Sequence, residues 1–466
     1  MPAMGEITER FRNRIIEKRD EYLEVLKEML SFPSVSATGE GMDEAPERVA
    51  RALERAGLRV EIFREFNGYP AVWGELREER HGTLLIYNHY DVQPPDPIEK
   101  WTSDPFKPSI RDGRIYARGA CDNKGNLAAR LCAIDLLMDS VGEVPLNIKF
   151  LVEGEEEIGS PNLEKFFKNH RDSLSADACL WEMGGSSPEG RPLIYLGAKG
   201  ILYLEIHATE KRPDLHSSWG AIVRNPALEL VHVISTLRNR EGLVTVDGFY
   251  DDVEKPDSET LALLDELGSA ESEIRAVAGE DGLISRKPLK ELFTDLTMMP
   301  CINVCGLNSG YTGPGSKTVL PNTAYAKIDV RLVPRMRPEK ILELIIKHVE
   351  RVSGGRVSVR PLEKGYPAAR TSPSEPFVEL VKMTAEAAHG VKPLVYPSSP
   401  GSGPMYLVTD FLGTPCVAAG IGDHRSNIHA PDESISLEDY LKGILHIALT
   451  IINFVPYLRS GVAPYL

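Results

Sequence analysis

Apolar and polar positions along the first two hundred residues predict helices and strands in turn. Apolar residues at near-helical spacing predict helices over about 6–31, 126–138 and 162–169. Short apolar runs predict strands over 58–63, 71–76, 82–88, 146–151 and 178–181. This order is typical of an α/β domain with a central, mostly parallel sheet flanked by helices.

The pattern changes near residue 197. Beyond it, alternating positions predict strands over 201–209, 302–307 and 324–333. Helices are predicted after Asn225-Pro226 and around 341–349. Strand, helix, two strands and helix form a compact α+β unit, and we expect the polar, acidic stretch over 247–286 to pack on it.

The α/β pattern returns after about residue 369. A strand is predicted over 415–420 and a last helix over 437–454. We therefore predict a discontinuous α/β domain made of 1–196 and 372–466, with residues 197–371 inserted as a lid.

Composition excludes several classes of protein. The chain of 466 residues has a net charge of −15, which argues against nucleic-acid binding and offers no basic patch to an anionic membrane. Apolar runs such as 443–455 are too short to span a membrane, and the first residues carry no secretory signal. The six cysteines lack CxxC pairing and are expected to be free thiols in a reducing cytoplasm.

Charged and imidazole side chains gather where predicted strands of the α/β domain end. His89 and Asp91 follow the strand over 82–88, and Glu182 follows 178–181. The acidic run Glu155–Glu157 follows 146–151, and two histidines, His424 and His429, follow 415–420. Ligands of open α/β sheets bind outside the carboxyl ends of the strands, so these side chains are expected to converge.

Each of these residues has an ordinary structural interpretation when taken alone. His89 could be a satisfied loop histidine, Asp122 an N-cap, Glu182 a surface acid and Glu155–Glu157 a solvated loop. Their convergence at four strand ends favours a metal site instead, because clustered carboxylates need cations. Histidine and carboxylate ligands without thiolate suit zinc, manganese or cobalt.

Three longer motifs resemble one family of enzymes. They are His89-Tyr90-Asp91-Val92-Gln93, the run from Arg118 to Gly125 and the run from Glu153 to Ser160. With Asp214–Ser217, Asp329–Pro334 and His429–Glu433, the chain resembles the co-catalytic dinuclear metallopeptidases, which include glutamate carboxypeptidase, acetylornithine deacetylase and the cytosolic dipeptidases (carnosinases). The segment from Gly248 to Val253 is most similar to the dipeptidase branch.

The resemblance implies a role for nine residues and, in the inserted unit, for His216 as well. Two divalent metal ions are expected, zinc first and manganese or cobalt as alternatives, with Asp122 bridging them. His89 and Glu182 would complete one site, and Glu157 and His429 the other. Asp91 would orient His89, and Glu156 would be the general base. Arg331 would bind a substrate carboxylate with help from Ser402, and the peptide bond from Asp122 to Asn123 would be cis.

The inserted unit would then be a lid and dimerisation domain. His216 lies in this unit and would reach the partner subunit's active site in a homodimer. Strand alternation places Arg331 with Lys327 and Asp329 on the face opposite the apolar one, which is also compatible with a solvated strand face. Spacing alone does not choose His429 over His424 or Glu156 over its neighbours; the resemblance does.

The expected activity is hydrolysis of an amide bond in a dipeptide or short peptide with a free carboxylate. One departure matters, because the dipeptidase branch usually has Asp where this chain has Glu182. An N-acyl amino-acid deacylase of the same family is therefore the alternative, and a non-catalytic relative is a third hypothesis. A nucleotide-binding P-loop at 310–318 is disfavoured, since Ser316 breaks the Gly-Lys step and a strand is predicted to follow.

Overall fold

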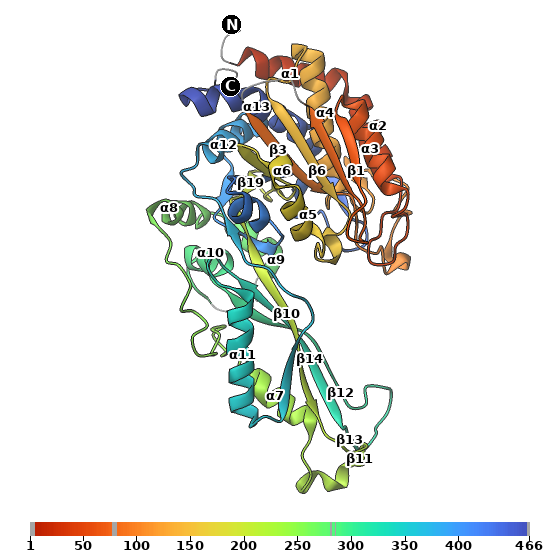
Figure 1. Cartoon of the computed structure of the whole chain (residues 1–466), viewed down its shortest axis with the longest axis vertical. Coiled ribbons are helices and arrows are strands. Elements are labelled where there is room, and N and C mark those ends of the chain that lie inside the picture. Colours follow the sequence, from red (N-terminus) through yellow and green to blue (C-terminus); the bar gives the residue numbers. More distant parts are fainter. Residues whose placement is uncertain (1–4, 77–81, 280–281, 285, 464–466) are drawn as a thin grey trace.

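The computed structural model describes residues 5–76, 82–279, 282–284 and 286–463. Two β-sheets dominate an elongated molecule, one at each end (Figure 1). Among these residues the larger sheet has ten strands and the smaller one six.

The larger sheet is mixed, and its centre is mostly parallel, as predicted. Four neighbouring strands run parallel in the order β6, β3, β7, β19. They are β6 (Asn147–Glu153), β3 (Thr83–His89), β7 (Ala178–Trp181) and β19 (Cys416–Ala419). The flanking strands are β1 (Arg59–Phe63), β2 (Ala71–Leu76), β9 (Pro192–Tyr195), β8 (Gly185–Ser186), β20 (Gly422–Asp423) and β17 (Leu394–Tyr396).

Both faces of this sheet are covered, which explains the continuous apolar runs of its central strands. Along β3, Leu84 and Ile86 belong to one core, and Leu85 and Tyr87 belong to the other. The first core is closed by α1 (Glu6–Glu17), α2 (Arg19–Leu30), α3 (Ala45–Arg55), α4 (Lys124–Val141), α12 (Pro376–His389) and α13 (Leu437–Ser460). The second is closed by α5 (Leu163–Asn169), α6 (Arg171–Leu174) and the π-helical turn η4 (Leu407–Leu412).

Several helices differ from their predicted bounds, and two of these differences are informative. The helix predicted over 6–31 is two helices, because Lys18 leaves the helical conformation with φ −92° and ψ 9°. The last helix runs to Ser460 instead of 454 and is long and apolar enough to cross a membrane. However, 67% of its most apolar 18-residue segment is buried inside the protein. The helix packs against α4 and α12, as a core helix does.

The smaller sheet confirms the predicted insertion. Its strands are β12 (Cys301–Ser309), β14 (Thr323–Leu332), β10 (Gly197–Thr209) and β15 (Val357–Pro361), with β16 (Ala369–Arg370) and β18 (Ser399–Ser402) beside the start of β10. Leu204 and Ile328 lie on the face that packs against α7 (Pro226–Ser235) and α11 (Pro338–Ser353). The short strands β11 (Leu215–His216) and β13 (Val319–Leu320) lie at the far end (Figure 1). The predicted domain boundaries stay a prediction.

The stretch over 247–286 packs differently from the prediction. Phe249 enters the core of the smaller sheet as expected. The helices that follow are α8 (Ser258–Leu267), α9 (Glu271–Ala278) and α10 (Leu289–Met298). Leu264, Leu267 and Phe293 instead form a separate core with Tyr396 of β17, a strand of the larger sheet. Their apolar faces are too short for periodicity to say which sheet they cover.

Candidate metal centre

The four parallel strands bring the predicted residues to one edge of the larger sheet. His89 is the last residue of β3, and Glu182 follows the last residue of β7. Beyond the end of β6, Glu156 and Glu157 begin the short helix η2 (Glu156–Ile158). The chain beyond β19 returns through β20 to a loop that carries His429. The sheet order therefore produces the predicted convergence.

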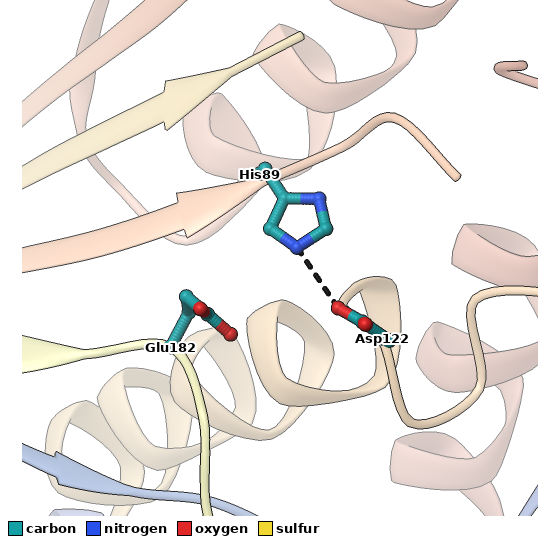
Figure 2. A group of neighbouring side chains, drawn as sticks. All are labelled: His89, Asp122 and Glu182. Atoms are coloured by element: carbon teal, nitrogen blue, oxygen red, sulfur yellow. Dashed lines mark hydrogen bonds and ion pairs between the residues drawn. The ribbon is translucent and has the colours of Figure 1, made fainter. Parts of the chain in front are cut away.

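Two clusters of possible metal ligands share Asp122. One consists of His89, Asp122 and Glu182, and the other of Asp122, Glu157 and His429, with ligand atoms within 4.8 Å of one another. Figure 2 shows the first cluster, with the imidazole of His89 directed at Asp122. Its Nε2 lies 3.0 Å from Asp122 Oδ1, and His429 Nε2 lies 3.1 Å from Asp122 Oδ2. The carboxylate of Asp122 thus faces both clusters, as a bridging ligand would.

Asp91 supports both clusters. Its backbone oxygen lies 3.0 Å from His89 Nδ1, so the Nε2 of that ring is the atom that faces Asp122. Its two carboxylate oxygens accept hydrogen bonds from the amides of Glu156 (3.2 Å) and Glu157 (3.0 Å). Asp91 therefore holds the turn that carries the acidic pair, a role that sequence did not indicate.

Burial and negative charge dominate the electrostatics. Burial, with the nearby charges of Glu157, Glu182 and Asp122, raises the pKa of Glu156 well above its usual value. Burial also raises the pKa of Glu182 to about 7. Hydrogen bonds to Asp122 and Glu157 raise the pKa of His429 to about 10. Carboxylates held this close attract protons, and the same charge favours a divalent cation.

The residues present fit a pair of divalent metal ions. Within the described part of the chain, Glu157 Oε1 is buried and has no hydrogen-bond partner. Such an orphaned carboxylate oxygen is costly unless a cation or water satisfies it. The donor set of imidazole and carboxylate is the set that zinc, manganese and cobalt accept.

A buried carboxylate, Glu433, holds the Asp122 loop, and sequence reasoning gave it no role. It accepts hydrogen bonds from the amides of Gly119 (3.1 Å), Cys121 (2.9 Å) and Asp122 (3.0 Å). The guanidinium of Arg118 donates to it at 2.6 Å, and both side chains are excluded from solvent. In the sequence, Glu433 could have been noticed only as an acid close to His429, in a motif that is also rich in loop-forming residues.

A second set of hydrogen bonds connects α4 and its N-cap residue with Glu182. The side-chain amide of Asn123 donates to Glu182 Oε2 at 3.0 Å, and its oxygen accepts from Asn88. Arg130, almost fully buried, donates to Asn88 Oδ1 at 2.7 Å. The peptide bond from Asp122 to Asn123 is cis, as the resemblance implied.

The loop that carries His429 has unusual backbone geometry. His429 itself has φ 62°, and Asn427 and Asp432 are also left-handed. Non-glycine residues seldom adopt this conformation, which recurs at functional sites. His424 is exposed and belongs to neither cluster among the described residues.

Arg331 and Ser402 meet in a different place. Arg331 Nη1 donates to Ser402 Oγ at 2.8 Å, and its Nε donates to Asp329 Oδ2 at 2.9 Å. Arg331 therefore pairs with Asp329 and lies beside Ser402, while its binding of a substrate carboxylate stays a prediction.

His216 is not brought to the metal centre within one chain. It is exposed in β11, which lies at the far end of the molecule from the larger sheet (Figure 1). Its Nδ1 contacts Ser218 Oγ (2.9 Å) and its Nε2 contacts Thr318 Oγ1 (3.2 Å). Residues 310–318 form an exposed loop that leads into β13, so they are not the strand-to-helix loop that a P-loop requires.

A family comparison decides the class of protein. The sequence profile of Peptidase family M20/M25/M40 matches residues 85–453. The chain belongs to this family. The predicted family and enzyme class are confirmed, and the protein is a metallopeptidase.

Family relatives match almost the whole chain. The Cys-Gly metallodipeptidase dug1 of Schizosaccharomyces pombe is 27% identical over 454 residues, covering 92% of this chain and 94% of the relative. The M20 family metallo-carboxypeptidase Sso-CP2 of Sulfolobus solfataricus is 41% identical with a TM-score of 0.87, covering 93% and 99%. Human carnosine dipeptidase 1, at 24% identity and a TM-score of 0.82 over 97% and 99%, shares the fold.

Proposed function

We propose that this metallopeptidase hydrolyses the amide bond of dipeptides or short peptides that carry a free carboxylate. The observation that carries the proposal is the sharing of Asp122 between two ligand clusters, with the half-buried acid Glu156, whose pKa is raised, beside them. Two relatives support the substrate class, since one is named a Cys-Gly metallodipeptidase and another a metallo-carboxypeptidase.

In this proposal His89, Asp122 and Glu182 hold one divalent ion, and Asp122, Glu157 and His429 hold the other. When bound, the ions supply an activated water and polarise the carbonyl that it attacks. Glu156 accepts the proton of the attacking water and delivers it to the leaving amine. Asp91 keeps the amides of Glu156 and Glu157 in place, so that the proposed base and the neighbouring metal ligand keep their positions relative to each other. Zinc is the proposed metal, with manganese or cobalt as alternatives.

Arg331 and Ser402 are proposed to bind the free carboxylate of the substrate. A guanidinium can donate two parallel hydrogen bonds to a carboxylate. Asp329 Oδ2 lies 2.9 Å from Nε and 2.8 Å from Nη2 of Arg331, so the edge of the guanidinium that carries Nη1 faces Ser402 and would meet the substrate.

The second candidate is deacylation of N-acyl amino acids. Glu182 favours it, because Glu at this position is more typical of the carboxypeptidase and deacetylase branches than of the dipeptidase branch. The two activities share the metal ligands and Glu156 and differ in the group that the site accepts.

We also propose that the protein acts as a homodimer through the inserted unit. The large apolar side chains exposed in this unit include Trp219 (53%), Ile222 (78%), Leu228 (68%) and Val231 (50%), which lie close together in the sequence. Exposed apolar side chains of this kind favour a surface that a partner covers. A second copy would bring His216 to the other subunit's active site, where an imidazole can stabilise the oxyanion of the reaction. The six free cysteines support the proposed cytoplasmic location.

The test is hydrolysis by metal-stripped protein refilled with zinc, manganese or cobalt. The substrates are dipeptides and N-acetyl amino acids of matched carboxyl-terminal residue. Turnover of dipeptides supports the first candidate, and turnover of the acetylated set alone supports the second. The Glu156→Gln variant is the control and should bind both metals while losing at least about 100-fold in kcat. Retention of more than a few per cent of activity by this variant would contradict the proposed base.

A further inference from the structure

A pocket of about 650 Å³ adjoins the proposed carboxylate site. Arg331 lines it, and so do Pro400 and Gly401, which immediately precede Ser402. None of the five candidate metal ligands is among its lining residues. Its volume is within the range of small-molecule sites, about 300–1,000 Å³. The pocket is therefore continuous with the carboxylate site and distinct from the metal centre.

The walls of this pocket are mainly apolar. They come from Leu243, from Ile274 of α9, from Leu292 and Leu296 of α10, and from Pro300. Leu243 is 50% exposed and Leu296 37% exposed. Apolar side chains that surround a hollow without filling it gain free energy when an apolar group enters.

Helix packing explains why these side chains face the hollow. Phe293 of α10 points into the core shared with α8 and β17, and it is fully buried. Leu292 and Leu296 are four residues apart and lie on another side of the same helix, which is the side that lines the pocket. The helices over 258–298 thus have two apolar surfaces, one packed on the larger sheet and one open.

We infer that this pocket receives the side chain of the substrate residue that carries the free carboxylate, and that it selects a large apolar side chain. The inference rests on the proposed function. A side chain and a carboxylate leave the same Cα, so a carboxylate held by Arg331 and Ser402 places the side chain beside the lining of the pocket.

Charged groups at the pocket refine the expected order of substrates. Lys199 Nζ donates to the backbone oxygen of Met299 at 2.7 Å, and Arg238 Nε donates to that of Gly242 at 2.9 Å. Lys287 and Asp295 pair with each other at 2.7 Å. Arg331 pairs with Asp329, and the acid Glu241 also lines the pocket, so Lys199 and Arg238 leave a small excess of positive charge that disfavours a basic side chain. Leucine or phenylalanine at the carboxyl terminus should be preferred to glycine, and glycine to lysine.

The experiment compares Gly-Leu, Gly-Phe, Gly-Gly, Gly-Lys and Gly-Glu as substrates of the metal-loaded protein. The expected kcat/KM for Gly-Leu exceeds that for Gly-Gly by about tenfold or more. Two uncharged variants, Leu243→Gln and Leu296→Gln, should each reduce the ratio of kcat/KM for Gly-Leu to that for Gly-Gly at least threefold.

The matched control is Leu261→Gln. Leu261 is 39% exposed on α8, close to the 37% of Leu296 on α10, and it does not line the pocket. This variant should keep the wild-type preference. Calorimetric titration with free leucine and free glycine gives a readout that needs no turnover, and leucine should bind more tightly in a way that Leu296→Gln reduces.

The outcomes separate the two proposals. Cleavage of all five dipeptides with equal efficiency, a preference for Gly-Glu, or an equal effect of the control variant would overturn the inference and leave the proposed function standing. Absence of dipeptide turnover would overturn the proposed function. In that case, leucine binding no tighter than glycine binding would overturn the pocket assignment as well.

Discussion

Replacement of Glu433 by alanine tests how the Asp122 loop is held. The variant leaves the guanidinium of Arg118, which is fully buried, without its carboxylate partner. Breaking a buried ion pair by removal of one partner costs about 3–5 kcal/mol. The amides of Gly119, Cys121 and Asp122 also lose their acceptor, so the upper part of this range is expected.

The assay is equilibrium unfolding in urea or guanidinium, on metal-free and metal-loaded protein. A surface glutamate provides the control, because Glu438 forms an ion pair with Lys442 at 2.6 Å while remaining 75% exposed. Glu438→Ala should change the free energy of unfolding by less than about 1 kcal/mol. Metal affinity of Glu433→Ala should fall by about 10–100-fold, since the loop that presents Asp122 is no longer fixed. Equal stability of the two variants would refute the reasoning.

Three other outcomes are expected. Asp122→Ala should release both metal ions, since both clusters use this residue, and full metal occupancy by elemental analysis would contradict it. His216→Ala should lower turnover without loss of metal, and mixed dimers with Glu156→Gln subunits should regain activity if His216 acts across subunits; no recovery on mixing would exclude that action. Burial lowers the pKa of His389 to about 3 and of His446 to about 4, so the unfolded chain binds more protons below pH 6.5. Stability should therefore be full above about pH 6.5 and fall by up to about 1.4 kcal/mol per pH unit per histidine between pH 6.5 and 4, a slope that His389→Phe should reduce in unfolding experiments.

Strand order explains how much of the site could be predicted. Apolar runs located β3, β6, β7 and β19, and the rule that ligands bind at carboxyl ends placed His89, the run Glu155–Glu157 and Glu182 together. The rule succeeds because these four strands are neighbours and parallel. Periodicity carries no information on which of several adjacent acids turns inward, so Glu156 and Glu157 came from the resemblance.

Other features of the centre depend on contacts that no local pattern encodes. Arg130 and Asn88 are polar residues within an apolar helix and an apolar strand, and only the packing of α4 on β3 shows that they meet. Glu433 contacts residues more than 300 positions earlier in the chain. The helices over 258–298 likewise pack on β17, more than 100 residues ahead.

The length of β10 makes the position of its far end sensitive to small changes at its start. β10 is continuous for 13 residues, so it is roughly 40 Å long, and a rotation of about 10° at its start displaces its far end by roughly 7 Å. Its start is tightly fitted, since a Cβ at Gly197 would lie 2.1 Å from the oxygen of Ala369 and one at Gly200 would lie 2.5 Å from the oxygen of Tyr366. We therefore expect an added methyl group at Gly197 or Gly200 to change the position of β11, which carries His216, more than the positions of the metal ligands at the ends of β3 and β7.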